Sequence, residues 1–204
     1  MVQPRNCWVR FLANETVLGL FRHGQTDWNI DLRLQGTADI PMNQVGIQQV
    51  QQAALHLPTE WDIVLSSPLE RARHTAEILA ERIGAKEVMQ DDLLLERAFG
   101  IGEGMLYTEW HEKYSQLDEI PGAESTQAVT QRARLLLSEV TKRHTGARVL
   151  AVSHGALIRF VLSEVTDGKV PPKGERLENA SLHVLRAQES WTLDAWAPKP
   201  LGSS

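Results

Sequence analysis

Two stretches of the chain share one design, in which an apolar run ends abruptly in His-Gly. The first run covers residues 16–21 and is followed by Arg22-His23-Gly24. The second covers residues 149–152 and is followed by Ser153-His154-Gly155. Each run has the length and residue types of a buried strand. Open α/β sheets bind ligands beyond the carboxyl ends of their parallel strands, so these two ends predict a single binding site.

The rest of the chain alternates short strand patterns with longer amphipathic helices. We expect strands over residues 16–21, 62–66, 87–89, 149–153, 181–186 and 191–195, and helices over 43–57, 68–83, 107–114, 125–144 and 156–164. This order predicts an α/β protein with three layers, α/β/α, around a mostly parallel sheet, and a small lobe of helix and loop over the site.

Two local expectations are more specific. Ser67 should cap the 68–83 helix, with Pro68 at the first helical position and Glu70 completing a capping box. Residues 27–42 should form a long polar loop, and loops of that length in compact domains are usually functional.

A chain of 204 residues suits one domain, so we expect residues 1–204 to form a single unit. Residues 1–15 would be an N-terminal extension, and residues 97–123 a short lid or specificity insertion. The net charge of −5 argues against a nucleic-acid partner, and no apolar run approaches the ~20 residues of a membrane span. With one cysteine, Cys7, an internal disulfide is excluded, and we expect a cytoplasmic protein.

Cationic and imidazole side chains follow three of the expected strands. They are Arg22 and His23 after the first, Arg71 just past the second, and His154 after the fourth. Because parallel strands end at one edge of a sheet, we expect these groups to converge. Arginine forks bind phosphate bidentately, and a neutral imidazole among them can accept a phosphoryl group.

Phosphoryl transfer also needs a proton for the departing alkoxide. Glu96 is the best candidate, because it lies in a glycine-rich stretch where backbone can pack closely around a site. Glu103 and Asp27 are weaker candidates for the same role.

Five blocks of the sequence, in this order, resemble the histidine phosphatase superfamily, which contains cofactor-dependent phosphoglycerate mutases, fructose-2,6-bisphosphatases and many small phosphatases. The blocks are Arg22-His23-Gly24-Gln25-Thr26-x-Trp28-Asn29, Leu34-Gln35-Gly36, Ser66-Ser67-Pro68-Leu69-x-Arg71-Ala72, Glu96-x-x-Phe99-Gly100-x-x-Glu103-Gly104 and Ser153-His154-Gly155. The resemblance runs from about Val17 to Arg186, which is most of the chain, and the order of the blocks makes it specific.

The resemblance implies a phosphoglycerate mutase-like fold and a phosphatase that uses no metal and no organic cofactor. It implies that His23 becomes a transient phosphohistidine, and that Arg22, Arg71 and His154 hold the phosphoryl group. Glu96 would first donate a proton and then act as the base for water. The residues expected to bind substrate are Asn29, Gln35, Gly36 and Gly155.

The residues favour a hydrolase over a mutase. A mutase must bind a carboxylate and exclude water, yet the segment 98–122 is short and holds one basic residue, Lys113. We therefore expect a phosphomonoester hydrolase acting on a small phosphorylated metabolite, with mutase activity as the alternative and a low-turnover phospho-ligand binder as a third. In the lobe, Tyr107, Trp110, His111 and Tyr114 would either shape the leaving-group pocket or pack beneath it. The sequence does not identify the substrate. It also leaves open whether the protein forms a homodimer through an edge of its sheet.

Overall fold

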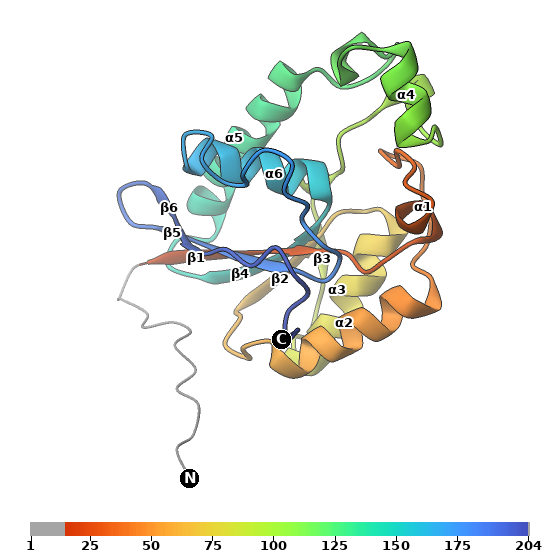
Figure 1. Cartoon of the computed structure of the whole chain (residues 1–204). Coiled ribbons are helices and arrows are strands. Elements are labelled where there is room, and N and C mark those ends of the chain that lie inside the picture. The colour runs from red at the N-terminus through yellow and green to blue at the C-terminus, as the bar shows by residue number, and fades with distance from the viewer. Residues whose placement is uncertain (1–14, 204) are drawn as a thin grey trace.

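The structure is a computed structural model that describes residues 15–203. Within that range a single sheet of six strands lies between two layers of helices (Figure 1). The strands are β1 (Thr16–Arg22), β2 (Ile63–Ser66), β3 (Met89–Gln90), β4 (Arg148–Ser153), β5 (Leu182–Ala187) and β6 (Trp191–Ala195). Their order across the sheet is β3-β2-β4-β1-β5-β6.

Four neighbouring strands are parallel. β1 pairs with β4, β4 with β2, and β2 with β3, all in the same direction, whereas β5 and β6 form an antiparallel hairpin beside β1. The expected mostly parallel sheet is therefore confirmed. Its consequence is that β1, β2 and β4 deliver their carboxyl ends to one edge.

Helices cover both faces of the sheet, as the strand–helix alternation predicts. α2 (Gln44–His56) and α3 (Glu70–Ile83) cover one face, and α5 (Thr126–Arg143) and α6 (Gly155–Val165) cover the other (Figure 1). In β1, Val17 and Phe21 pack toward the α2–α3 side, while Leu18 and Leu20 pack toward the α5–α6 side. A central strand buried on both faces explains why its sequence is a continuous apolar run.

A small lobe lies at the carboxyl edge of the parallel strands. It contains α4 (Tyr107–Lys113) and the single turns η2 (Gly100–Gly102) and η3 (Leu117–Glu119), and it packs around Leu34, Phe99, Trp110 and Ile120. In Figure 1, α4 stands on the same side of the molecule as α1 (Asp27–Ile30), the short helix that follows β1. The remaining element, the turn η1 (Asp92–Leu94), follows β3.

The expected start of α3 was wrong. The helix begins at Glu70, and its N-cap residue, Leu69, makes no side-chain capping bond. Asp39 supplies the cap from another loop, since its Oδ1 accepts the Glu70 N–H at 2.7 Å. The Ser67 hydroxyl is therefore available for a different contact, with His154.

Three smaller expectations also need comment. The polar stretch 27–42 contains a helix, α1, because Thr26 and Asn29 form a capping box at its start. β3 covers Met89–Gln90 rather than 87–89. The expected N-terminal extension falls almost entirely on residues 1–14, which lie outside the described residues. Across residues 15–203 no helix is both long enough and apolar enough to cross a membrane.

Candidate active site

The two imidazoles meet at the carboxyl edge of the sheet. In the parallel pairing of β1 with β4, Arg22 lies opposite Ser153, so the next residues, His23 and His154, leave the sheet side by side. Their ring centroids are 5.1 Å apart, with the planes tilted by 56°. Both rings are buried, with exposures of 2% and 0%. The predicted convergence of these two residues is therefore present.

Only one nitrogen of the His23 ring is hydrogen-bonded within the described part of the chain. Its Nδ1 lies 2.7 Å from the Gly24 carbonyl oxygen, which can only accept, so Nδ1 carries the proton and Nε2 is left with a free lone pair. Burial, followed by the positive charges of Arg71 and Arg22, lowers the pKa of His23 well below its ordinary value. The ring is neutral at pH 7, which is the form that can act as a nucleophile.

Both nitrogens of His154 are committed. Nδ1 accepts a hydrogen bond from Arg71 Nε at 3.2 Å, so Nε2 carries the proton and donates to the Ser67 hydroxyl at 2.8 Å. Burial is the main cause that lowers the pKa of His154 well below its ordinary value, with Arg71 and His23 adding to it. His154 is thus a neutral donor fixed in one tautomer.

Arg71 is fully buried, and its guanidinium is held by a loop. Its terminal nitrogens donate to the carbonyl oxygens of Gly36 at 2.8 Å and Ala38 at 2.7 Å. Burial lowers the pKa of Arg71 to about 10, so the group remains a cation at pH 7. Such a cation can neutralise a phosphate.

Glu103 holds the loop that binds Arg71, so its role differs from the one considered in the sequence. Its carboxylate accepts the N–H groups of Thr37 and Ala38, each at 2.9 Å. Gly36 has φ +58°, and a Cβ there would lie 2.1 Å from Glu103 Oε1. Glycine is required at this point, because a side chain would displace the carboxylate. Neither Glu103 nor Asp27 lines the cavity described below.

Arg22 offers a free donor. Its Nη1 donates to the Leu177 carbonyl oxygen, while its buried Nε has no hydrogen-bond partner within residues 15–203. Gly155 lies beside this guanidinium, and a Cβ at that position would be in ordinary contact with it, 3.4 Å from Nε. Burial lowers the pKa of Arg22, and the nearby Glu96 carboxylate acts in the opposite direction. An unpartnered buried N–H is costly unless a ligand accepts its hydrogen bond.

Glu96 lies at the N-terminus of α6. Its two carboxylate oxygens accept the N–H groups of Ala156 and Leu157, each at 3.1 Å, and one of them also accepts the Arg97 N–H. No side chain of the N-cap residue, His154, satisfies these donors, so Glu96 does. The positive end of the helix stabilises a carboxylate at this position.

These groups surround a cavity of about 640 Å³. Its walls include eight of the nine predicted site residues, namely Arg22, His23, Asn29, Gln35, Gly36, Arg71, Glu96 and Gly155. His154 does not line it, because that ring is covered by its contacts with Arg71 and Ser67. From the lobe, Tyr107, Trp110 and His111 line the cavity and Tyr114 does not.

Asn29 and Gln35 stabilise the turn after His23. Asn29 Oδ1 accepts the Thr26 N–H at 3.1 Å, and Gln35 Nε2 donates to the Thr26 hydroxyl at 2.7 Å. The Gln35 Oε1 atom is buried without a partner in the described part of the chain.

Several residues that line the cavity were missed by sequence reasoning, among them Arg159, Arg176, Leu177 and Asn179. Asn179 donates to the His23 carbonyl oxygen at 2.9 Å and to Asn29 Oδ1 at 3.1 Å, so it ties the β1 end to the chain before β5. No repeated spacing or motif marks these positions. Among residues 15–203 no group of three or more His, Cys, Asp or Glu side chains is arranged to hold a metal ion.

The chain is similar to known sequences and structures of one family. The model of the histidine phosphatase superfamily (branch 1) matches residues 18–198. "Uncharacterized phosphatase PhoE" of Bacillus subtilis (strain 168) is 37% identical over 181 residues, covering 87% of this chain and 92% of that protein. "Metal-independent phosphoserine phosphatase" of Arabidopsis thaliana is 34% identical over 203 residues, covering 93% of this chain and 84% of that protein.

A solved structure gives the same result for the fold. The native mycobacterial glucosyl-3-phosphoglycerate phosphatase superposes with a TM-score of 0.76 at 29% identity, covering 89% of this chain and 98% of that one. The chain therefore belongs to the histidine phosphatase superfamily. Its fold is phosphoglycerate mutase-like, and the relatives that it matches include named phosphatases of this superfamily.

Proposed function

We propose that the protein is a metal-independent phosphomonoester hydrolase that works through a phosphohistidine at His23. The observation that carries this proposal is the free, neutral Nε2 of His23 beside two cations that line the same cavity, Arg22 and Arg71, with the His154 ring centroid 5.1 Å from that of His23. An unprotonated imidazole nitrogen is the nucleophile that the first step needs, and the donors match the negative charge that develops on phosphorus-bound oxygens.

In the first step, His23 Nε2 forms a bond to phosphorus while the bond from phosphorus to the leaving oxygen breaks. The Glu96 carboxyl transfers its proton to that oxygen, which departs as an alcohol. In the second step, Glu96 takes a proton from water as the water oxygen attacks phosphorus. The phosphorus–nitrogen bond breaks, and His23 returns to its neutral form beside inorganic phosphate.

Glu96 must move to act in this way. Its carboxylate is docked on the first turn of α6, and a protonated carboxyl is a poorer acceptor for those N–H groups. Substrate binding places phosphate charge next to the same helix N-terminus. We expect Glu96 to leave its docked position when a substrate binds.

A small phosphorylated metabolite is the substrate class we propose. The cavity of about 640 Å³ is in the usual size range for a small-molecule site. Two relatives are named for acting on phosphoserine and on glucosyl-3-phosphoglycerate, and both of those compounds are phosphomonoesters of small organic molecules.

Mutase activity is the second candidate. One observation in the structure supports it, although the sequence alone argued against it. Lys113 is the only lysine or arginine of segment 98–122, but Arg159 and Arg176 line the cavity from other elements. The shortness of the lobe still favours access of water to the phosphohistidine.

The first test is hydrolysis of p-nitrophenyl phosphate by chelator-treated full-length protein. In the second, the protein is incubated briefly with ³²P-labelled substrate, and the stability of the label on the protein is measured in acid and in alkali. We expect metal-independent turnover and a label that is lost in acid and kept in alkali. An inert protein, or a label with the opposite stability, would contradict the proposal. Interconversion of 2- and 3-phosphoglycerate with added 2,3-bisphosphoglycerate, faster than their hydrolysis, would establish the mutase instead.

A further inference from the structure

The arginines of the chain divide into two groups according to whether they meet a carboxylate. Eight arginines of residues 15–203 form ion pairs within 4.0 Å: Arg33, Arg73, Arg97, Arg132, Arg134, Arg143, Arg148 and Arg186. The five described arginines that form none are Arg22, Arg71, Arg82, Arg159 and Arg176. Four of these five line the same cavity, and Arg82 is the exception.

Two of the four are already explained by the phosphoryl site. Arg22 and Arg71 lie next to His23, and together they balance the two charges of a phosphate monoester. Arg159 and Arg176 are additional positive charge in the same cavity. The carboxylates lining it are Glu96, which the chemistry uses, and Glu178.

Arg159 is placed by α6. It lies four residues after Gly155, so both are on one face of the helix, and Gly155 is where the Arg22 guanidinium packs. The Arg159 side chain is half-buried, and one of its terminal nitrogens donates to the Glu175 carbonyl oxygen. It is thus held in position while donors remain for a ligand.

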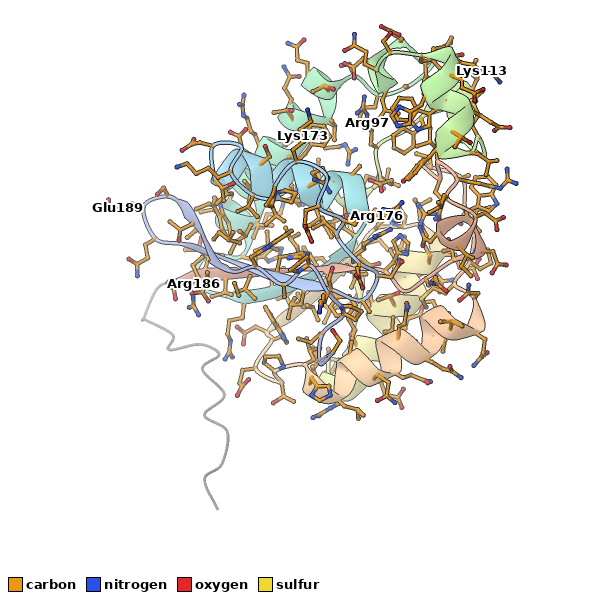
Figure 2. All side chains as sticks on the ribbon, viewed as in Figure 1. Arg97, Lys113, Lys173, Arg176, Arg186 and Glu189 are labelled. Carbon is orange, nitrogen blue, oxygen red and sulfur yellow. The ribbon has the colours of Figure 1, made fainter. Side chains whose placement is uncertain are left out.

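Arg176 is placed by the segment that leads from α6 to β5, and Figure 2 shows it in the region between α6 and α1. It directly precedes Leu177, whose carbonyl oxygen accepts the Arg22 hydrogen bond. Its guanidinium carbon lies 5.9 Å from the centre of the Tyr107 ring, so an aromatic face of the lobe supports it. Burial is the main cause of the lowered pKa of Arg22, and the charges of Arg176 and Arg159 add to it, which indicates that all three guanidiniums are close.

We propose that the substrate carries a second anionic group on its leaving portion, and that Arg159 and Arg176 bind it. The group is a carboxylate or a second phosphate, because a guanidinium fork recognises either one. This inference deepens the proposed function and depends on it, since it concerns the leaving group of the same reaction. The cavity then selects its substrate by two anions, one transferred and one retained on the product.

Matched substrate pairs test the proposal and distinguish the two anions. For the carboxylate, kcat/KM is compared between O-phosphoserine and O-phosphoethanolamine, which lacks it. For the phosphate, fructose 1,6-bisphosphate is compared with fructose 6-phosphate. We expect the wild-type protein to prefer the more anionic member of one pair by about tenfold or more. Equal kcat/KM within both pairs, in a protein that hydrolyses p-nitrophenyl phosphate, would overturn this inference and leave the proposed function intact.

Variants assign the preference to the two arginines. We expect Arg159→Gln and Arg176→Gln each to reduce the preference by about three- to tenfold, and the double variant to abolish it. Arg159→Lys keeps a charge without the fork and should retain part of the preference. Arg82→Gln is the matched control, because this exposed arginine is also unpaired but lies outside the cavity.

The remaining outcomes are decisive as well. A double variant with undiminished preference would assign the selectivity elsewhere and overturn the proposal. A wild-type preference that falls steeply with added salt, alongside an unaffected Arg82→Gln variant, would support it. A protein that hydrolyses none of these substrates, p-nitrophenyl phosphate included, would refute the proposed function itself.

Discussion

His23 and His154 end two neighbouring parallel strands, and each is followed by glycine, yet their rings are held in different ways. His23 commits only Nδ1, to the carbonyl of its own neighbour, and keeps Nε2 free. His154 commits both nitrogens, one to Arg71 and one to Ser67. The same His-Gly pattern therefore leaves a free imidazole nitrogen in one place and a fully hydrogen-bonded ring in the other. Which is which depends on contacts from other strands and loops.

The chain after each histidine differs too. After His154 the helix α6 begins at once, and its first N–H groups are available to Glu96. After His23 the chain turns toward α2, and the Gly24 N–H donates to Thr75. A Cβ on Gly24 would lie 2.5 Å from the Gly46 carbonyl oxygen, so this turn is packed too tightly for any side chain. The comparison can be tested by removing each ring and its partners in turn.

The largest expected effect is that of His23→Ala. We expect kcat for p-nitrophenyl phosphate to fall by at least about 10⁴-fold and the acid-labile phosphoenzyme to disappear, because the other imidazole that lines the cavity within the described residues, His111, belongs to the lobe and stacks on Trp110. Steady-state kinetics and ³²P labelling measure both. The control is His56→Ala, at an exposed position near the end of α2. A variant that still accumulates the label would show that the two histidines had been assigned the wrong way round.

A smaller loss is expected for His154→Ala. His154 accepts the hydrogen bond of Arg71 Nε, so removing its ring should misplace the Arg71 cation at the transferred phosphoryl group and lower kcat by about 10²- to 10³-fold, while His23 keeps its free nitrogen. The phosphoenzyme should therefore still form, more slowly, in single-turnover labelling. If this variant behaves as His23→Ala does, with no labelled protein at any time, the distinction between the two rings is refuted.

Glu96→Gln should have an effect that depends on the leaving group. We expect about a 10²-fold loss of kcat on alkyl phosphates and under tenfold on p-nitrophenyl phosphate, since a stable phenolate needs little protonation. Glu87→Gln, on the exposed surface before β3, is the matched control. Equal losses on the two kinds of substrate would mean that Glu96 only caps α6.

The smallest expected effect concerns the free energy of unfolding. It follows from a property that the two rings share, a pKa lowered by burial. Burial lowers the pKa of His23 and of His154 well below the unfolded value of about 6.5, and it lowers the pKa of His183 to about 3. A lowered folded-state pKa gives stability that is present above about pH 6.5 and is lost as the pH falls, because only the unfolded chain then takes up the proton. His183, with a folded-state pKa of about 3, should cost about 2 kcal/mol of unfolding free energy between pH 7 and pH 5, and His23 and His154 should add to this loss in the same direction.

Urea unfolding at a series of pH values measures this dependence. His183→Phe, which removes a buried imidazole outside the cavity, should reduce the loss between pH 7 and pH 5 by about 2 kcal/mol, whereas His56→Ala should leave it unchanged. A stability that is flat from pH 7 to pH 5 would show that the buried rings take up protons in the folded state.

The sequence predicted the sheet and most of the site because strand ends obey a simple rule. Residues that follow parallel strands share one edge, so Arg22, His23 and His154 could be placed together without coordinates. Arg71 followed from its position in the first turn after β2. The apolar runs of β1 and β4, buried on both faces, marked the centre of the sheet.

The parts that the sequence could not predict depend on three-dimensional packing between distant segments. Ser67 fits the pattern of a helix cap, but the cap comes from Asp39, which is 31 residues away from Glu70. Arg176 and Asn179 lie in an irregular connection with no periodicity, and Arg159 is one polar position among several on α6. Nothing in their spacing shows that they reach the cavity.

The way Arg159 and Arg176 are attached to the fold has an evolutionary consequence. His23 and His154 are anchored by the register of β1 and β4, and most changes there would damage the sheet as well as the site. Arg176 instead belongs to a surface connection, where substitutions, insertions and deletions are tolerated. Descendants of this chain can therefore acquire new substrates by altering that connection and the outer face of α6, while the inherited reaction stays intact.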